Sequence, residues 1–221
     1  MERGIKADLT FTARALALEE PRFTRELGPG LLMDYTRLTQ NGCYHGTIEV
    51  KGDRIAVTPD AWLGTRDRSW GIRPIGRPDD AAQQALLLQF YWLWAPVNFD
   101  DCISIYDLNS DEKGEPWHTH GAIAPLHQGP PETMESVSSS IRYRSGTRHA
   151  EAAEITFHRK GGEELVLQFE PLYQFYMSGI GYTHPEWGHG TDRGELDLTY
   201  DTIDLDSVDE ASPLYLHIQA I

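Results

Sequence analysis

Apolar and polar residues alternate along much of the chain, as they do in half-buried β-strands. Residues 9–14 follow this period of two, and residues 44–58 and 154–169 each contain two such runs around a glycine-containing turn. Glycine supplies the positive φ angles that tight turns need, so both segments are predicted to be β-hairpins. Further strands are expected at four β-rich runs: residues 86–94, 102–108, 196–200 and 214–218.

These strands, together with weak helix signals, predict an all-β protein. Many short strands separated by turns are typical of an antiparallel barrel or sandwich. A polar stretch at residues 128–140 contains two prolines and a serine run, which predicts a linker. We therefore expect one β domain over residues 1–127 and a second, incomplete one over residues 141–221. The strand-like residues 213–221 would leave an open sheet edge, so we also consider a homodimer that covers it.

Charge and composition exclude several classes of protein. The chain has 221 residues, with 34 acidic against 19 basic side chains and a net charge of −15, which disfavours partners such as nucleic acids and anionic membranes. Residues 1–8 lack the apolar core of a signal peptide, so a cytoplasmic protein is expected. Two distant cysteines cannot form an all-cysteine zinc site. No phosphate-binding loop or hydrolase motif is present, so no cofactor is expected.

The most unusual segment is residues 60–74, which concentrates tryptophan and charged side chains. Asp67 lies between Arg66 and Arg68 in the sequence, which predicts ion pairing of its carboxylate. Trp70 offers a face on which Arg68 or Arg73 could stack. Such an assembly of tryptophan and arginine could be a purely structural plug. Alternatively, Asp67 faces a cavity and acts as an acid.

The run from Trp62 through Arg66-Asp67-Arg68-Ser69-Trp70-Gly71 resembles the Asp-[Arg/His]-x-Trp-Gly motif of the AttH-like and hydroxyneurosporene synthase (carotenoid hydratase) superfamily. This resemblance implies two lipocalin-like (calycin) β-barrels in tandem, with a hydrophobic cavity. Some members hydrate, isomerise or cyclise terpenoid-type substrates. A second segment, residues 181–190, is similar to a motif of uncharacterised bacterial relatives. The implied function is binding of a small hydrophobic, terpenoid- or steroid-like molecule, with or without such a reaction.

Two groups of histidines carry further chemistry. His118 and His120 would point to the same face of a strand, as metal ligands often do. His184 and His189 could join them, with Glu115 or Glu186 as a carboxylate partner. The alternative is that His118 and His120 make ordinary hydrogen bonds. His184 and His189 lie in a segment punctuated by glycine and proline, so they are expected in a loop, where an imidazole could exchange protons with a ligand.

The sequence leaves three kinds of function open. An enzyme would use Asp67, His184 and His189 as its catalytic residues. A non-catalytic carrier would lack an acid and a histidine that converge on the cavity. A metal enzyme built on His118 and His120 is the third hypothesis; otherwise no metal is expected. In the first two cases the ligand would contact charged and aromatic side chains: Arg66, Arg68, Trp70, Arg73, Trp92, Trp94, Tyr182, Glu186 and Trp187.

Overall fold

The computed structural model describes residues 4–27, 30–72, 91–127, 129–176, 191–200, 202–210 and 217–220, together with 184, 186 and 188. Over these residues the chain forms antiparallel strands and one short 3-10 turn, η2(Leu205–Ser207), with no α-helix. The all-β prediction is therefore confirmed. No sheet in the described ranges closes into a barrel. The chain divides into two compact units, residues 1–73 with 91–136 and residues 74–90 with 137–221.

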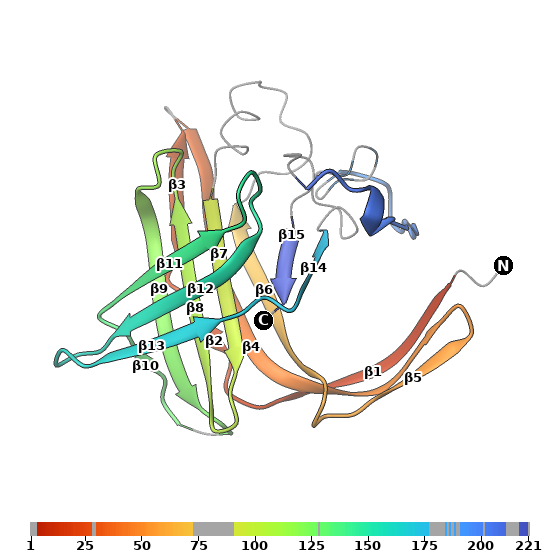
Figure 1. The fold of residues 1–221 in the computed structure, drawn as a ribbon, viewed down its shortest axis with the longest axis horizontal. Coiled ribbons are helices and arrows are strands. Elements are labelled where there is room, and N and C mark those ends of the chain that lie inside the picture. Colours follow the sequence, from red (N-terminus) through yellow and green to blue (C-terminus); the bar gives the residue numbers. More distant parts are fainter. Residues whose placement is uncertain are drawn as a thin grey trace. The chain divides into compact units, whose positions relative to one another are not determined.

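The first unit is organised around one long strand, β4(Gly30–Val50) (Figure 1). The strands β3(Phe23–Leu27), β2(Leu18–Glu19) and β1(Ile5–Ala13) pair with successive parts of one edge of β4. The strands β6(Leu63–Ile72) and β5(Asp53–Val57) pair with the other edge. The β4–β5 pair is the hairpin predicted at residues 44–58, and Lys51 and Gly52 in its turn have positive φ angles.

A four-stranded sheet completes the first unit, in the order β10(Glu132–Thr133), β9(Pro116–Pro125), β8(Cys102–Ser110), β7(Tyr91–Asn98). One face of this sheet packs against one face of the six-stranded sheet. The alternate side chains that point to these two faces meet between the sheets. The shared apolar core contains Ala15, Leu18, Ile103, Ile105, Ala122 and Ala124, all buried. This core has the layering of a β-sandwich rather than the open interior of a barrel.

The two faces of the six-stranded sheet have different environments. Odd-numbered residues of β4 from Arg37 to Asn41 point to the inner face, where Arg37 reaches β8 and Asn41 reaches β7. Even-numbered residues of β4 and β6 point away from the four-stranded sheet, and we call this the distal face. Beyond Gly42, β4 is paired mainly with β1 and β5, which form a three-stranded arm (Figure 1).

The second unit contains a three-stranded sheet of β11(Ser136–Tyr143), β12(Ala150–His158) and β13(Glu164–Phe169). The β12–β13 pair confirms the hairpin predicted at residues 154–169. The strands β14(Tyr173–Tyr176) and β15(His217–Ala220) form a separate pair. Among the residues that the structure describes, no helix is long and apolar enough to cross a membrane.

Two segments differ from their expected conformation. Residues 196–200 were predicted as a strand from alternation alone, but they are irregular, and Leu196 and Leu198 are exposed. Apolar and polar residues do alternate at 196–200, but these residues do not pair with a neighbouring strand. A strand needs such a hydrogen-bonding partner. The polar stretch 128–140 contains β10 and the beginning of β11. The division between the units falls after Ser136, and the proposed boundaries at 127 and 141 stay a prediction.

Candidate functional site

The first unit contains a buried charged cluster between its two sheets, centred on Arg37 of β4. Arg37 donates from Nη2 to Oε2 of Glu20 at 2.5 Å and from Nε to Oε1 at 3.0 Å. The same Nη2 donates to Oδ2 of Asp107 on β8 at 3.2 Å. The side chains of both acids are fully buried, and only 6% of the Arg37 side chain is exposed. Two carboxylates therefore share one guanidinium in the interior.

Aromatic rings surround the Arg37 guanidinium. Its carbon lies 4.9 Å from the ring centroid of Trp94, 5.5 Å from that of Trp92 and 5.3 Å from that of Phe23. The two tryptophan rings are stacked 5.8 Å apart. Each indole N–H donates to one of the acids, Trp94 to Oε1 of Glu20 at 3.3 Å and Trp92 to Oδ1 of Asp107 at 3.1 Å. Trp92 and Trp94, which were expected to contact a ligand, both have partners in this cluster, and their contact with a ligand stays a prediction.

The two acids of the cluster differ in their affinity for protons. Burial tends to raise the pKa of Glu20, but hydrogen bonds from Arg37 and its charge outweigh that effect and hold the pKa below its ordinary value. Thr39 also donates to Oε1 of Glu20 at 2.7 Å. Burial raises the pKa of Asp107 above its ordinary value, while His118 and Arg37 oppose the rise. Glu20 is therefore the ionised partner of Arg37, and Asp107 is the carboxyl that takes up a proton more readily.

His118 and His120 lie on β9 and face the cluster, as the alternation on a strand predicts. The His118 ring stacks on Phe23 with centroids 3.9 Å apart, and its Nε2 lies 3.5 Å from Oδ2 of Asp107. Burial lowers the pKa of His120. His118 Nε2 and His120 Nδ1 are buried polar atoms without a hydrogen-bond partner in the described chain.

The metal hypothesis finds no ligand set in the described part of the chain. No group of three or more histidine, cysteine or acidic side chains there is arranged to hold a metal ion. The carboxylate that approaches His118 is Asp107. Of the two acids proposed from the sequence, Glu115 is exposed, and Glu186 belongs to the second unit.

The charged motif on β6 is divided between the two faces of the sheet. Asp67 lies in register opposite Thr39, on the inner face, whereas Arg66 and Arg68 lie opposite Gln40 and Leu38 on the distal face. Neighbours along a strand point in opposite directions, so the predicted pairing of Asp67 with its flanking arginines is not formed. Within the described residues, no cation–π contact joins Trp70 to an arginine, so the predicted stacking of Arg68 is also absent.

The distal face is covered by aromatic rings where β4 enters the arm. Phe11 and Tyr44 meet edge to face, with centroids 5.1 Å apart. Phe11 lies over Gly42 and Tyr44 over Gly64, so closely that a Cβ there would be 2.3 Å and 2.4 Å from the rings. The Arg66 guanidinium lies 5.2 Å from the Phe11 centroid and donates to Oε1 of Gln40 at 3.0 Å and 2.7 Å. Arg66 thus packs on Phe11.

The distal side of the arm is an exposed apolar surface. Among the side chains that register places there are six aliphatic ones: Ile5, Ala7, Leu9, Ile48, Val50 and Ile55. Val57 and Asp53 of β5 lie on the same side, and Val57 is buried. Ile5 is 57% exposed, and Leu9 and Ile55 are each 39% exposed. The opposite side of the arm carries polar residues such as Lys6, Asp8 and Glu49. We call the six aliphatic residues, with Phe11 and Tyr44, the apolar strip.

The remaining predicted site residues belong to other parts of the chain. Arg73, Tyr182, Trp187 and His189 lie outside the described residues. His184 accepts a hydrogen bond at Nδ1 from the backbone N–H of Glu186 at 3.2 Å, and Glu186 is exposed. Both belong to the second unit, whereas Asp67 belongs to the first. The catalytic group of Asp67, His184 and His189 therefore stays a prediction.

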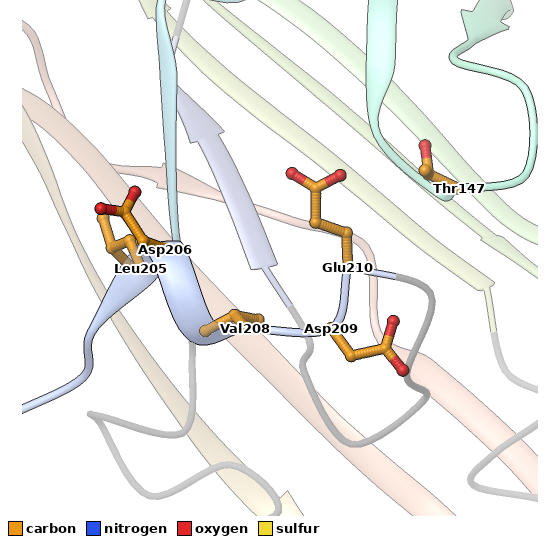
Figure 2. A pocket seen from close by; sticks show the side chains of 6 residues that line it. All are labelled: Thr147, Leu205, Asp206, Val208, Asp209 and Glu210. Carbon is orange, nitrogen blue, oxygen red and sulfur yellow. The ribbon is translucent and has the colours of Figure 1, made fainter.

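The second unit has an open, acidic hollow of about 530 Å³ (Figure 2). Its lining includes the carboxylates of Asp206, Asp209 and Glu210. Glu210 also pairs with Arg144, whose hydrogen bond holds the pKa of Glu210 below its ordinary value. This hollow is polar and does not have the lining expected of a hydrophobic ligand site.

The sequence analysis missed Glu20, Arg37 and Asp107. Each acid is separated from Arg37 by many residues, and Asp107 lies 70 positions away from it. The available signal was a charged residue at a core-facing position of an alternating strand, because such a residue needs a buried partner. The sequence contains many acids that could supply one.

The fold and these features define an all-β protein with a two-sheet unit, a buried charged cluster and an exposed apolar strip. The chain belongs to a family of unknown function (DUF8625), whose model matches residues 1–221. No curated protein and no solved structure matches the chain.

Proposed function

We propose that the chain binds a small hydrophobic molecule on the distal face of the six-stranded sheet. The observation that carries this proposal is the apolar strip, an amphipathic three-stranded surface. Its aliphatic side chains are exposed at Ile5, Ala7, Leu9 and Ile55 and half-buried at Ile48 and Val50. Exposed apolar patches of this kind mark binding surfaces, because leaving them in water costs free energy. A three-stranded sheet also needs its hydrophobic side covered to be stable.

The likeness of the β6 motif to AttH-like proteins supports the same proposal. Arg66, Arg68 and Trp70, which were expected to contact a ligand, share the distal face with the apolar strip. Trp70 is 45% exposed, so its ring is available to an apolar molecule. A terpenoid- or steroid-like ligand would contact this face, rather than the interior of a closed barrel.

The arrangement favours binding without catalysis over a hydratase or isomerase. Protonation of an alkene needs an acid that touches the bound substrate. Asp107 and His118, which pair an acid with an imidazole, are on the inner side of the sheet, and Asp67 points to that side as well. The apolar strip lies on the other side. A carrier or sensor function therefore fits the described residues better than an enzyme.

A fluorescence titration with an apolar, environment-sensitive dye tests this proposal. Leu9→Asp places a charge in the apolar strip, and Thr10→Asp places the same charge on the polar side of the same strand. We expect the wild type and Thr10→Asp to bind the dye with similar affinity and Leu9→Asp to bind about tenfold more weakly or not at all. Thermal melts would establish that both variants are folded. Equal affinities for all three proteins, or no binding by the wild type, would contradict the proposal.

A further inference from the structure

Two arginines on the distal face have no acidic partner in the described chain. Arg66 contacts the Phe11 ring and the Gln40 amide oxygen, both of which are uncharged. Arg68 is exposed and makes no ion pair or side-chain hydrogen bond within the described residues. The chain has 34 acidic and 19 basic side chains, yet no carboxylate of the described residues pairs with either of these two cations.

The two guanidinium groups are close enough to act on one anion. Arg66 and Arg68 are alternate residues of β6, so their Cα atoms are about 7 Å apart and both side chains point to the distal face. A guanidinium presents a planar fork of donors that matches a carboxylate or phosphate oxygen pair. Two of them side by side on one face provide a site for a single anionic group.

Of the acids nearest to Arg66 and Arg68 on the distal face, one is paired with another arginine and the other is separated from Arg68 by a strand. Asp34 accepts from Arg22 at 2.5 Å and 2.7 Å. Glu19 lies in register with Leu38, which separates it from Arg68 on the next strand. Among the described residues, neither Asp34 nor Glu19 therefore forms an ion pair with Arg66 or Arg68.

The cationic pair adjoins the apolar strip. Phe11 lies directly beneath the Arg66 guanidinium, and the strip continues from Phe11 along β1 to Ile5. Six residues of extended strand span about 20 Å. A molecule with its charged end at Arg66 and Arg68 could therefore lay a long apolar tail along Leu9, Ile48 and Ile55.

We propose that the ligand is an amphiphile with one anionic head group, bound by Arg66 and Arg68, and a long apolar tail that covers the strip. This inference rests on the proposed function, because it names the class of molecule that the distal face binds. The charge of the head complements the two arginines. The net charge of −15 repels a second copy of this chain much more strongly than it repels a molecule with a single negative charge.

The test compares two amphiphiles that differ only in the head, dodecanoate and dodecanol, by displacement of the apolar dye at neutral pH. The variants are Arg68→Gln and Arg66→Gln/Arg68→Gln, and Arg54→Gln on the polar side of β5 is the control. We expect dodecanoate to bind the wild type about tenfold more tightly than dodecanol does, and this preference to vanish in the Arg68 variants but not in Arg54→Gln. The preference should also shrink at high salt.

The outcomes separate this inference from the proposed function. Equal binding of dodecanoate and dodecanol by the wild type would overturn the anionic head group and leave the hydrophobic site standing. Binding of neither molecule would overturn both. A particle mass of two chains, with the dye excluded until the dimer dissociates, would show that a second copy occupies the strip and would overturn the inference. Because Arg66 packs on Phe11, the single Arg68→Gln variant keeps the test informative if the double variant does not fold.

Discussion

The guanidinium of Arg37 holds the carboxylate of Glu20 in a two-pronged pair, with Nη2 2.5 Å from Oε2 and Nε 3.0 Å from Oε1, and the Glu20 side chain has no exposure to solvent. The same guanidinium reaches Asp107 across the interface between the sheets. Arg37 therefore connects the two layers of the first unit and compensates two buried acids. The stability of this unit should depend on Arg37 far more than on any surface ion pair.

Replacing Arg37 by methionine should destabilise the protein strongly. Methionine keeps most of the apolar volume but leaves Glu20 and Asp107 without a cation, and removing one partner of a buried pair costs about 3–5 kcal/mol. Chemical unfolding measures this loss. Arg142→Met, which breaks the exposed pair with Glu151, should change the free energy of unfolding by less than about 1 kcal/mol. Similar small effects for both variants would refute a structural role for the cluster.

A double variant separates charge from packing in the same cluster. Glu20→Gln combined with Arg37→Met removes the acid whose pKa is lowered and leaves only Asp107, whose pKa is raised, beside the missing cation. The double variant should therefore be more stable than Arg37→Met alone. The measurement is the same unfolding titration. If the double variant is instead the less stable of the two, the loss in Arg37→Met comes from its aromatic contacts with Trp92, Trp94 and Phe23 rather than from unpaired charge.

The pH dependence of stability should reveal the neutral state of His120. Burial lowers the pKa of His120 in the folded chain, so below the ordinary value of 6.5 the unfolded chain binds more protons than the folded one. Its stabilising contribution is therefore present above pH 6.5 and is lost as the pH falls. One such group changes the free energy of unfolding by at most about 1.4 kcal/mol per pH unit. His120→Gln should unfold with a shallower dependence between pH 7 and pH 5.

Asp107 should change the pH dependence of stability in the opposite direction to His120. Its pKa is raised in the folded chain, so its contribution is present at low pH and is lost as the pH rises through the folded value. Asp107→Asn should remove this loss, which leaves a stability curve that rises more steeply from acid to neutral pH than that of the wild type. Parallel curves for the wild type, His120→Gln and Asp107→Asn would contradict these protonation states.

Gly42→Ala should disturb the distal face. The new methyl would lie 2.3 Å from the Phe11 ring and 2.5 Å from the backbone oxygen of Thr12, so the ring cannot keep its place beneath Arg66. Overpacking of this kind costs about 1–3 kcal/mol. We expect a lower melting temperature together with weaker binding of the apolar dye. Unchanged stability would show that Phe11 does not lie over Gly42 in solution.

Glu210→Gln should loosen one segment of the second unit. Glu210 pairs with Arg144 and lies 3.7 Å from His149 Nδ1, so it ties residues 202–210 to the turn between β11 and β12. Hydrogen exchange of residues 202–210 should become faster in Glu210→Gln, while β12 and β13 keep their protection. Asp197→Asn, which breaks the local Arg193 pair, is the control and should leave residues 202–210 unchanged.

Local patterns predicted the hairpins but not the way in which strands far apart in sequence combine. The β4–β5 and β12–β13 pairs follow from alternation and a glycine turn, because both strands of each pair are adjacent in the chain. Alternation does not specify that β4 continues for 21 residues and pairs with five other strands. That arrangement depends on contacts between distant segments, and so does the failure of residues 196–200 to find a partner.

The charged residues of the first unit also show how little local sequence patterns say about contacts. Asp67 and its arginines are adjacent in sequence, yet the pleat separates them onto two faces, so sequence neighbours were a poor guide to ion pairs. Arg37 and Asp107 are distant in sequence and are hydrogen-bonded. By contrast, the expectation that His118 and His120 share a face was confirmed, because it depended only on the period of a strand.

Hydrogen exchange with and without a bound long-chain ligand tests whether the ligand lies on the distal face. With saturating dodecanoate, we predict slower exchange in β1, β5, the end of β4 and β6, and no change in β8 and β9, which carry Asp107, His118 and His120. Protection confined to β8 and β9 or to the second unit, or no protection anywhere, would contradict the placement of the ligand on the distal face.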